Sequence, residues 1–285
     1  MSELLYLTWN PDIGVTIPFT HFTLRVYSFM YVIAFALGYY IMDRIFLKDK
    51  EDRRLLDPLL MYMFVAVIVG ARLGHVLFYD KELLTEDPLA VFLPIRTKPT
   101  FEFTGFQGLA SHGAAIGIVL ALYFYNKKYL KRNIFWILDR ITIPVAIGGM
   151  FIRIGNFFNS EIVGKPSDLP WAVKFYQQSG YGDIVPRHPA QLYEAFGYFL
   201  LFLSLLYVFF KTEKKKYLGW IFGYFLIILF GVRFIIEFFK EPQRKEEYIS
   251  WFGLNTGQWL SVPFILAGIY ILMASKNKIY VPKKT

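Results

Sequence analysis

Two arginines stand near polar partners at helical spacing, inside stretches of the sequence that are otherwise apolar. Arg153 precedes Asn156 by three residues and Arg233 precedes Glu237 by four, so each pair would share one face of a helix. A guanidinium group can bind phosphate through two parallel hydrogen bonds, and this binding is strongest where water is scarce. These residues therefore indicate a site for a ligand that carries a phosphate group.

Histidine side chains supply the candidates for proton transfer. His112 follows a stretch, residues 105–111, that is rich in glycine and small polar residues, and His188 opens a second polar motif. An imidazole titrates near neutral pH and can accept a proton there, although His112 could equally be a packing residue. His21 and His75 are weaker candidates. The four histidines show no spacing typical of metal ligands, so we expect no metal site.

The composition places these polar residues in a membrane protein. Of the 285 residues, 55% are hydrophobic and only 19% are charged, and the mean hydropathy is +0.40. This composition excludes a disordered chain, which would be poor in aromatic residues. The absence of cysteine excludes a small disulfide-linked secreted module and a thiol nucleophile supplied by the protein itself.

Seven apolar stretches are about long enough for membrane-spanning helices, which need roughly 20 residues each. The third begins in the small polar stretch before His112, which is typical of backbone that packs against protein or lines a cavity. We therefore expect an all-α polytopic membrane protein. Its predicted spans are Phe22–Phe46, Pro58–Tyr79, Leu109–Tyr125, Ile134–Asn156, Pro189–Phe210, Tyr217–Phe239 and Thr256–Ser275.

Lysine and arginine are distributed unevenly between the connections. Seventeen lie after the first, third, fifth and seventh spans, nine lie in the other connections, and five lie within or at the ends of spans. Because basic residues are retained in the cytoplasm, the N-terminus is predicted outside and the C-terminus inside. The net charge of +9 is then topological, and we expect no nucleic-acid partner.

Two of the connections on the predicted outer side are long and contain proline, glycine and aromatic residues. They cover about residues 80–104 and 157–188. Long connections of this composition are more often ordered than flexible. We expect a small extracytoplasmic cap, within a single transmembrane catalytic domain that covers residues 1–285.

Ionisable residues from four predicted spans lie at the level of the outer leaflet. Arg72, Arg153 and Arg233 are near the outer ends of their spans, and Glu194 is near the outer start of another. A charge at membrane depth is costly unless it is paired or hydrated, so such residues indicate function. The alternatives are that Arg233 and Glu237 form a structural ion pair, or that an arginine extends to the interface. The arginines outnumber the two glutamates, which favours a phospholipid head group as the ligand.

Several separated motifs resemble those of the bacterial prolipoprotein diacylglyceryl transferases. The stretch from Arg153 to Gly164 reads Arg-Ile-Gly-Asn-Phe-Phe-Asn-Ser-Glu-Ile-Val-Gly and is similar to the signature of that family. Further similar segments are residues 70–74, 111–117, 187–194, 233–239 and 257–261. The resemblance thus extends over most of the chain.

The sequence departs from the family pattern at three positions. Ile152 replaces the first glycine of the signature, and Ala114 replaces the second glycine of a His-Gly-Gly motif. Leu229 replaces a tyrosine that some members carry one turn before the arginine of the sixth span, so no tyrosine role is carried over there. Tyr27 matches a tyrosine that the family places beside its lipid site.

The resemblance implies an enzyme of the bacterial inner membrane whose active site faces the extracytoplasmic side. Such an enzyme transfers the diacylglyceryl group of phosphatidylglycerol to the lipobox cysteine of a prolipoprotein, forming a thioether and releasing glycerol phosphate. The implied partners are phosphatidylglycerol, prolipoprotein signal peptides and the surrounding membrane lipids. No cofactor is expected.

The resemblance also implies roles for individual residues. Arg153 and Arg233 would bind the leaving phosphate, and His112 would accept the thiol proton, with His188 as the alternative. A free thiol has a pKa of about 8.5, and nearby arginines would lower this pKa and favour the thiolate without a base. In that case His112 could serve only to orient the lipid. The residues expected to bind or orient substrates are Tyr27, Arg72, Asn156, Asn159, Glu161, Gly164, His188, Gln191, Glu194, Glu237 and Gln258.

Two other classes of function satisfy the same arginines. In an anion transporter they would line a pathway, and in a phospholipid-binding scaffold they would hold a lipid without chemistry. The charged residues lie at one level rather than along a path, and the sequence shows no repeated halves, which count against a transporter. An activity assay is needed to separate a scaffold from an enzyme.

Overall fold

The structure is a computed structural model that describes residues 6–12, 14–16, 23–103, 108–178, 183–242, 253–276 and 279–280. Some residues named above lie outside these ranges. They are His21, Phe22, the stretch 104–107, residues 179–182 of the expected cap, and Arg244, Lys245, Lys278, Lys283 and Lys284 of the basic residues in the connections.

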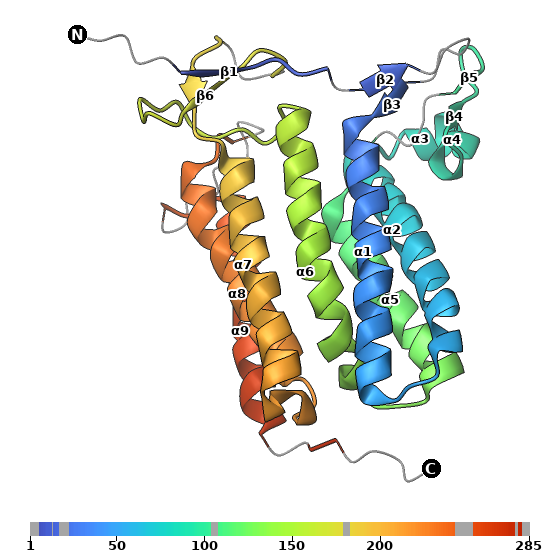
Figure 1. Ribbon diagram of the computed structural model, residues 1–285. Helices are drawn as coiled ribbons and strands as arrows, with labels where there is room; N and C mark the ends of the chain where they lie inside the picture. Colours follow the sequence, from blue (N-terminus) through green and yellow to red (C-terminus); the bar gives the residue numbers. More distant parts are fainter. Residues whose placement is uncertain are drawn as a thin grey trace. The chain divides into compact units, whose positions relative to one another are not determined.

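Helices make up most of the described chain and follow the predicted spans (Figure 1). The long helices are α1 (Val26–Asp49), α2 (Leu56–Tyr79), α5 (Ser111–Tyr125), α6 (Ile134–Phe158), α7 (Ala190–Lys211), α8 (Trp220–Ile236) and α9 (Thr256–Ser275). Six of them, all except α5, belong to helical segments long and apolar enough to cross a membrane. The expected all-α multi-pass membrane protein is confirmed.

The third predicted span is the one that differs in length. Helix α5 has 15 residues, which at 1.5 Å per residue gives about 22 Å, less than the hydrocarbon core of about 30 Å. A π-helical turn, η2 (Asn126–Leu130), continues it and ends at Lys131, which has a φ of 50°. A total of seven spans therefore stays a prediction, as does the orientation.

Short elements lie before α1 and in the connections between the long helices. They are η1 (Arg53–Leu55), α3 (Leu83–Glu86), α4 (Pro88–Phe92), η3 (Glu213–Lys216), η4 (Glu237–Phe239), β1 (Leu7–Trp9), β2 (Gly14–Thr16), β3 (Thr23–Arg25), β4 (Ile95–Arg96), β5 (Glu102–Phe103), β6 (Val173–Phe175) and β7 (Pro186–Arg187). The sheet order is β1-β6-β7, with Leu7 opposite Val173 in the parallel pair and Val173 opposite Arg187 in the antiparallel pair. The pairs β2–β3 and β4–β5 are antiparallel. Both stretches of the expected cap thus contain ordered elements.

The chain divides into two units, and each is described separately. The first unit comprises Met1–Met42 and Leu138–Thr285, and the second comprises Asp43–Ile137. In the first unit, α8 packs against both α7 and α9 (Figure 1). Its small core beside the sheet contains Phe157 and Phe175, with Trp9 donating a hydrogen bond of 3.0 Å to the Phe157 carbonyl.

A buried carboxylate in α6 fixes the start of α8. Both oxygens of Asp139 accept backbone hydrogen bonds, at 2.7 Å from Gly219 N and at 2.8 Å from Phe222 N. A helix N-terminus has free N–H groups and a partial positive charge, so a carboxylate is a favourable partner there. Gly219 has a φ of 91°, which ends the preceding turn. The helix therefore begins three residues after the predicted Tyr217.

In the second unit, glycines bring α2 and α5 into close contact. Gly70 and Gly74 of α2 face Gly113 and Gly117 of α5, and a Cβ atom at Gly74 would lie 2.6 Å from the Gly113 Cα. Small residues four apart let two helix backbones approach each other, which is a common way of packing helices in membranes. This contact holds the N-terminal turn of α5, and with it His112, against α2.

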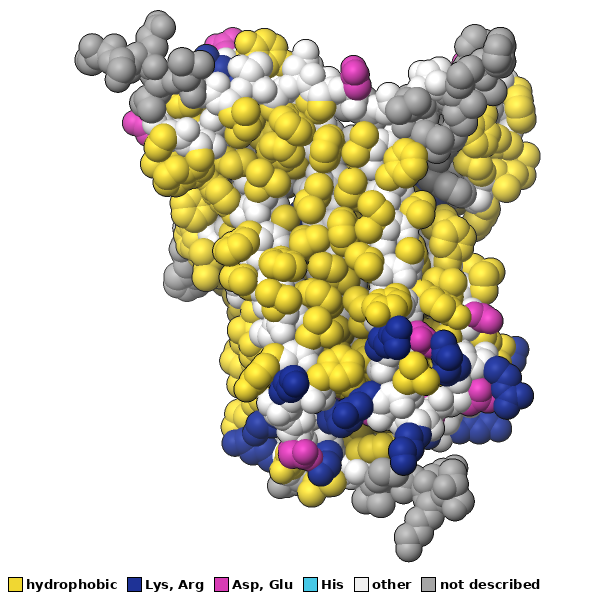
Figure 2. Space-filling model, in the orientation of Figure 1, with side chains coloured by type: hydrophobic (Ala, Val, Ile, Leu, Met, Phe, Trp, Pro, Cys, Tyr) yellow, Lys and Arg dark blue, Asp and Glu magenta, His cyan; other side chains and the backbone are white. Residues whose placement is uncertain are grey.

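The outer surfaces of the helices are apolar. Large exposed side chains include Phe196, Leu203 and Tyr207 on α7 and Phe264 and Tyr270 on α9. Figure 2 shows hydrophobic side chains over most of the visible helix surfaces, with Lys and Arg gathered near the lower helix ends. Surfaces of this kind are expected to face lipid.

We expect Gly113→Ala to lower the thermal stability of the protein. The added methyl group would overlap the backbone of α2, and overpacking of this kind costs about 1–3 kcal/mol. Thermal unfolding of the purified protein in detergent measures the effect. Gly231→Ala is the matched control, since a Cβ atom there would have no atom within 4 Å. Equal unfolding temperatures for the two variants would contradict the close contact.

Candidate functional site

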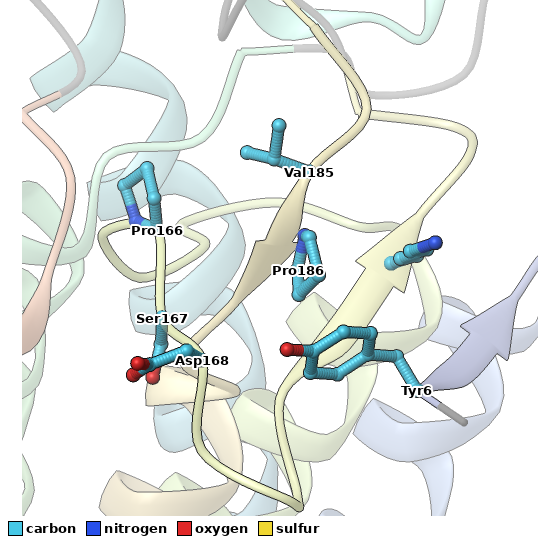
Figure 3. Close-up of a pocket in the computed structure, with 7 residues that line it drawn as sticks. Tyr6, Pro166, Ser167, Asp168, Val185 and Pro186 are labelled. Carbon is cyan, nitrogen blue, oxygen red and sulfur yellow. The ribbon is translucent and has the colours of Figure 1, made fainter. Parts of the chain in front are cut away.

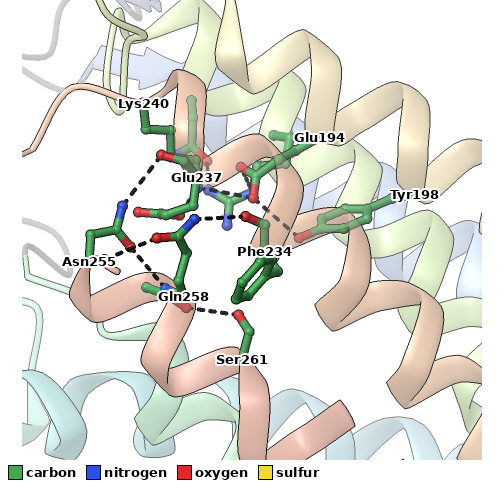
Figure 4. A network of polar contacts seen from close by, with 11 residues as sticks. Glu194, Tyr198, Phe234, Glu237, Lys240, Asn255, Gln258 and Ser261 are labelled. Atoms are coloured by element: carbon green, nitrogen blue, oxygen red, sulfur yellow. Dashed lines mark hydrogen bonds and ion pairs between the residues drawn. The ribbon is translucent and has the colours of Figure 1, made fainter. Parts of the chain in front are cut away.

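A buried carboxylate lies at the centre of a polar network in the first unit (Figure 4). The side chain of Glu194, in the second turn of α7, has no exposed surface. Its Oε2 lies 3.0 Å from Arg153 Nε and its Oε1 lies 3.0 Å from Lys240 Nζ. The hydroxyl of Tyr198, one turn further along α7, is 3.5 Å from Oε1. A carboxylate is tolerated at such a site because cations from two other elements neutralise it.

The end of α8 and the turn after it carry Lys240 and two further charged residues, Arg233 and Glu237. After Ile236 the helix tightens into the 3₁₀ turn η4, and Glu237 Oε2 lies 3.1 Å from Lys240 Nζ. The ion pair between Arg233 and Glu237, raised above as an alternative, is not formed in the described part of the chain, where the 3₁₀ turn brings Glu237 to Lys240, three residues later. Within the described residues, the buried Nε of Arg233 has no hydrogen-bond partner.

Cations outnumber carboxylates in the inner part of the network, around Glu194 and Lys240. Arg153, Arg233 and Lys240 carry three positive charges there, against two negative charges on Glu194 and Glu237, while Glu161 reaches Arg153 only through Asn156. All of these side chains lie at helix ends with little exposure, so their interactions are weakly screened by water. The excess positive charge favours an anionic ligand. Arg233, whose Nε has no hydrogen-bond partner among the described residues, can offer its guanidinium to phosphate.

The N-terminus of α9 packs against Glu237. A Cβ atom at Gly257 would lie 2.6 Å from Glu237 Oε1, so only glycine leaves room for the carboxylate. The preceding Asn255 caps the helix by accepting a 2.9 Å bond from Gln258 N, and Gln258 Oε1 accepts a 3.0 Å bond from Asn255 N. Gln258 is buried and also donates to the Phe234 carbonyl at 3.4 Å. Its side chain thus has a structural role at the edge of the network.

The segment after α6 adds amide and carboxylate groups. Arg153 Nη1 donates to Asn156 Oδ1 at 3.2 Å, which confirms the contact predicted from their spacing. Glu161 accepts from Asn156 Nδ2 at 3.2 Å and from Asn159 Nδ2 at 2.8 Å. Gln191 of α7 donates to the backbone carbonyl of Glu161 at 2.6 Å. Five predicted residues are thereby joined in one network.

The backbone on both sides of Glu161 is in an uncommon conformation. Ser160 and Ile162 have φ values of 54° and 55°. The left-handed region is unfavourable for a residue other than glycine, and above all for a β-branched one. Such conformations cost on the order of 1–3 kcal/mol and occur often at functional sites. The surrounding contacts therefore hold Glu161 in place against this cost.

Gly164 lies where three segments of backbone meet. A Cβ atom at this position would lie 2.5 Å from the His188 carbonyl oxygen and 2.8 Å from that of Phe239. Gly164 N donates to His188 O at 2.9 Å, and Gly164 forms a bridge to Lys240. The buried Arg187 donates to Gly164 O at 3.3 Å and pairs with Glu241 at 3.1 Å. This glycine therefore joins the segments that carry Glu161, His188 and Lys240.

His188 packs beside the network without reaching its charged centre. Its Nδ1 is 3.1 Å from the hydroxyl of Tyr193, which also accepts a 2.8 Å hydrogen bond from Trp171 Nε1. Its ring lies edge-on to Phe239 at 5.3 Å. Burial lowers the pKa of His188 below its ordinary value, so the imidazole is neutral at neutral pH.

Tyr27 lies in the first turn of α1 and packs against the signature segment. Its ring fills the space that a Cβ atom at Gly155 would need. Its hydroxyl is 3.5 Å from that of Tyr31, and it lies within electrostatic range of Arg153 and Glu161. Tyr27 thus lies beside the signature segment, and its role beside a lipid stays a prediction.

The second unit contains the two remaining predicted residues. Arg72 donates to the carbonyls of Ala90 at 2.7 Å and Val91 at 3.3 Å, which ties α4 to α2. His112, in the first turn of α5, is exposed, and its ring packs against Phe78 at 4.9 Å and Tyr79 at 5.7 Å. Arg72 therefore has a structural contact, whereas His112 has an accessible imidazole.

Two members of the network were not predicted from the sequence. Lys240 was counted as a basic residue of an outer connection, yet its side chain is 7% exposed and contacts two carboxylates. Tyr198 was read as part of an apolar span. It lies four residues after Glu194, and this helical spacing is the one sequence signal that could have indicated its role.

An open pocket of about 520 Å³ lies beside the sheet of the first unit (Figure 3). Its lining residues are Tyr6, Pro166, Ser167, Asp168, Lys174, Val185 and Pro186. None of the predicted site residues lines it. The described residues also contain no group of three His, Asp or Glu side chains that could hold a metal ion.

Comparison with known proteins places the chain in one family. A family model described as "Prolipoprotein diacylglyceryl transferase" matches residues 14–274. The chain belongs to this family. Relatives named phosphatidylglycerol–prolipoprotein diacylglyceryl transferase include one from Tolumonas auensis, 42% identical over 272 residues, which are 95% of this chain and 98% of the relative.

Two further relatives carry the same name. A diacylglyceryl transferase from Bacteroides fragilis is 38% identical over 271 residues, or 94% of this chain and 95% of the relative. One from Chloroherpeton thalassium is 35% identical over 285 residues, or 99% of both chains. The matched region of the family model, residues 14–274, spans the part of the chain that contains the network around Glu194.

We expect Glu194→Gln to lower the thermal stability of this protein strongly. The amide would leave the buried cations Arg153 and Lys240 without their carboxylate, and removing one partner of a buried pair costs about 3–5 kcal/mol. Thermal unfolding in detergent measures the loss. Glu213→Gln is the control, because Glu213 pairs with Lys216 in full solvent and should contribute little. A similar unfolding temperature for both variants would contradict the burial of the ion pairs around Glu194.

Proposed function

We propose that this protein transfers the diacylglyceryl group of phosphatidylglycerol to the lipobox cysteine of prolipoproteins. In this reaction the cysteine sulfur forms a bond to the glycerol carbon of the diacylglyceryl group. The bond from that carbon to the phosphate oxygen breaks, and glycerol phosphate leaves with the bonding electrons. The thiol proton passes to a base, so the products are a thioether and glycerol phosphate.

The observation that carries the proposal is the excess of positive charge around Glu194, in a chain of this family. The reaction needs a site that binds the phosphate and stabilises the negative charge that develops as the C–O bond breaks. Arg153 and Arg233 supply guanidinium groups for this purpose. Both lie near helix ends that the distribution of Lys and Arg predicts at the outer membrane surface, where a lipid head group resides.

Proton removal from the thiol is the second requirement. We infer that His112 accepts this proton, because its imidazole is exposed and an imidazole is the side chain most often used as a general base. His188 is the alternative, since its lowered pKa keeps it neutral and able to accept a proton. A cationic environment also lowers the pKa of a thiol, so the histidine and the arginines act in the same direction.

The remaining polar residues would orient the substrates. Asn156, Asn159 and Glu161 offer hydrogen-bonding groups to the head-group glycerol, while Tyr27 packs beside Arg153. Gly164, Gln191, Glu194, Glu237 and Gln258 would orient the residues that contact the substrates. Arg72, in the second unit, would also contribute to substrate binding. The distribution of Lys and Arg supports an inner-membrane protein whose site faces the extracytoplasmic side.

An assay of the purified protein tests this function. Incubation with phosphatidylglycerol and a synthetic lipobox peptide should add a diacylglyceryl mass to the cysteine, as measured by mass spectrometry. We expect Arg153→Ala and Arg233→Ala to lower the rate by at least about 100-fold, the usual effect of removing a group that stabilises developing charge. His112→Gln should lower it by about 100-fold or more if that residue is the base.

The controls separate the competing functions. Lys81→Met, at an exposed position, should retain the wild-type rate. A folded wild-type protein that binds the lipid but never modifies the peptide would support a lipid-binding scaffold instead. Passage of an anion across proteoliposomes without peptide modification would support a transporter.

A further inference from the structure

Lys240 is an unusual lysine because its ammonium group is buried between two carboxylates. Its Nζ lies 3.0 Å from Glu194 Oε1 and 3.1 Å from Glu237 Oε2, and the side chain is 7% exposed (Figure 4). A lysine of an ordinary surface connection would extend into water instead. Something in the fold must therefore keep this side chain out of water.

The backbone holds Lys240 at this position. Lys165 N donates to Phe239 O at 2.8 Å, and Glu241 N donates to Val163 O at 3.1 Å, so the residues on both sides of Lys240 are bonded to the segment after α6. The bridge between Gly164 and Lys240 lies between these two bonds. Backbone hydrogen bonds thus fix the main chain of Lys240, so its position does not depend only on the ion pairs of its side chain.

The alternative partner of the two carboxylates is Arg233. It interacts electrostatically with Glu194, and Glu237 follows it by four residues. Arg153 is already engaged by Glu194 and Asn156. If Lys240 were neutral, two glutamates would face two arginines, and the charge excess that favours an anion would vanish. Both Glu194 and Glu237 would then attract the guanidinium of Arg233.

We propose that Lys240 is a positioning residue that occupies Glu194 and Glu237, so that the guanidinium of Arg233 stays available for the phosphate of the lipid. This inference rests on the proposed function. It accounts for the buried Nε of Arg233, which has no hydrogen-bond partner among the described residues although Glu194 lies within electrostatic range. Lys240 acts through Arg233 and need not touch the lipid.

The test measures KM and kcat for phosphatidylglycerol at a saturating concentration of lipobox peptide, using the purified full-length protein in detergent. Lipid binding is measured separately, as the rise in unfolding temperature with added short-chain phosphatidylglycerol. The variants are Lys240→Met, Lys240→Gln, Lys240→Arg and the double variant Lys240→Met/Glu237→Gln. Lys81→Met is the control at an exposed lysine.

We expect Lys240→Met to raise KM by at least about tenfold, with a smaller effect on kcat and a matching loss of lipid-dependent stabilisation. Lys240→Arg should keep KM within about threefold of wild type, because it retains the charge. The double variant should recover most of the lost affinity, since removing the charge of Glu237 restores the excess of one cation.

Two results would overturn the inference in an active protein. An unchanged KM in Lys240→Met would show that Arg233 needs no such protection, and a double variant no better than Lys240→Met would assign Lys240 a direct or merely structural role. If Lys240→Met does not fold, Lys240→Gln takes its place with the same expected rise. Failure of the wild type to modify the peptide, despite lipid binding, would instead refute the proposed function.

Discussion

The positions of several helix ends in this structure depend on the burial of one negative charge. Glu194 has no exposed surface, and a carboxylate without water needs cations and hydrogen bonds from the protein. These come from α6 through Arg153 and from the end of α8 through Lys240. The lengths and end points of α6, α7 and α8 must therefore agree, because each helix has to bring its charged group to the same place.

Several structural choices follow from this requirement. Asp139 fixes where α8 begins, so the position of its last turn, and of Arg233 within it, is determined from the opposite end of the helix. The Asn255–Gln258 cap fixes where α9 begins, and Gly257 leaves room there for Glu237. Polar groups at helix ends thus determine where these helices begin, in a protein whose outer helix surfaces are largely apolar.

The sequence predicted the helices well because an apolar stretch of about 20 residues is rarely anything other than a membrane-spanning helix. The bounds of α9 agree with the prediction at both ends, whereas α8 begins later because Asp139 and Gly219, which precede its first turn, set its start. The contact between Arg153 and Asn156 was predictable because it lies inside a regular helix. The spacing of Arg233 and Glu237 also suggested an ion pair as an alternative. Among the described residues Glu237 contacts Lys240 instead, because the helix tightens into η4 at Glu237.

The role of Lys240 could not be predicted, since its partner Glu194 is 46 residues away in the sequence and only the folded chain brings them together. The same limit applies to Gly164, whose signature position was recognised but whose neighbours were not. Local spacing reveals contacts along a helix. It does not reveal contacts made where helices end and backbones cross.

The crossing at Gly164 also restricts how the protein can move. Three backbone segments meet there within the space of a single Cβ atom, and hydrogen bonds link them on both sides. A hinge needs backbone that can change its dihedral angles without colliding with neighbours. The segments that carry Glu161, His188 and Lys240 must consequently move as one body, and any opening that admits a lipid or a peptide has to pivot elsewhere in the chain.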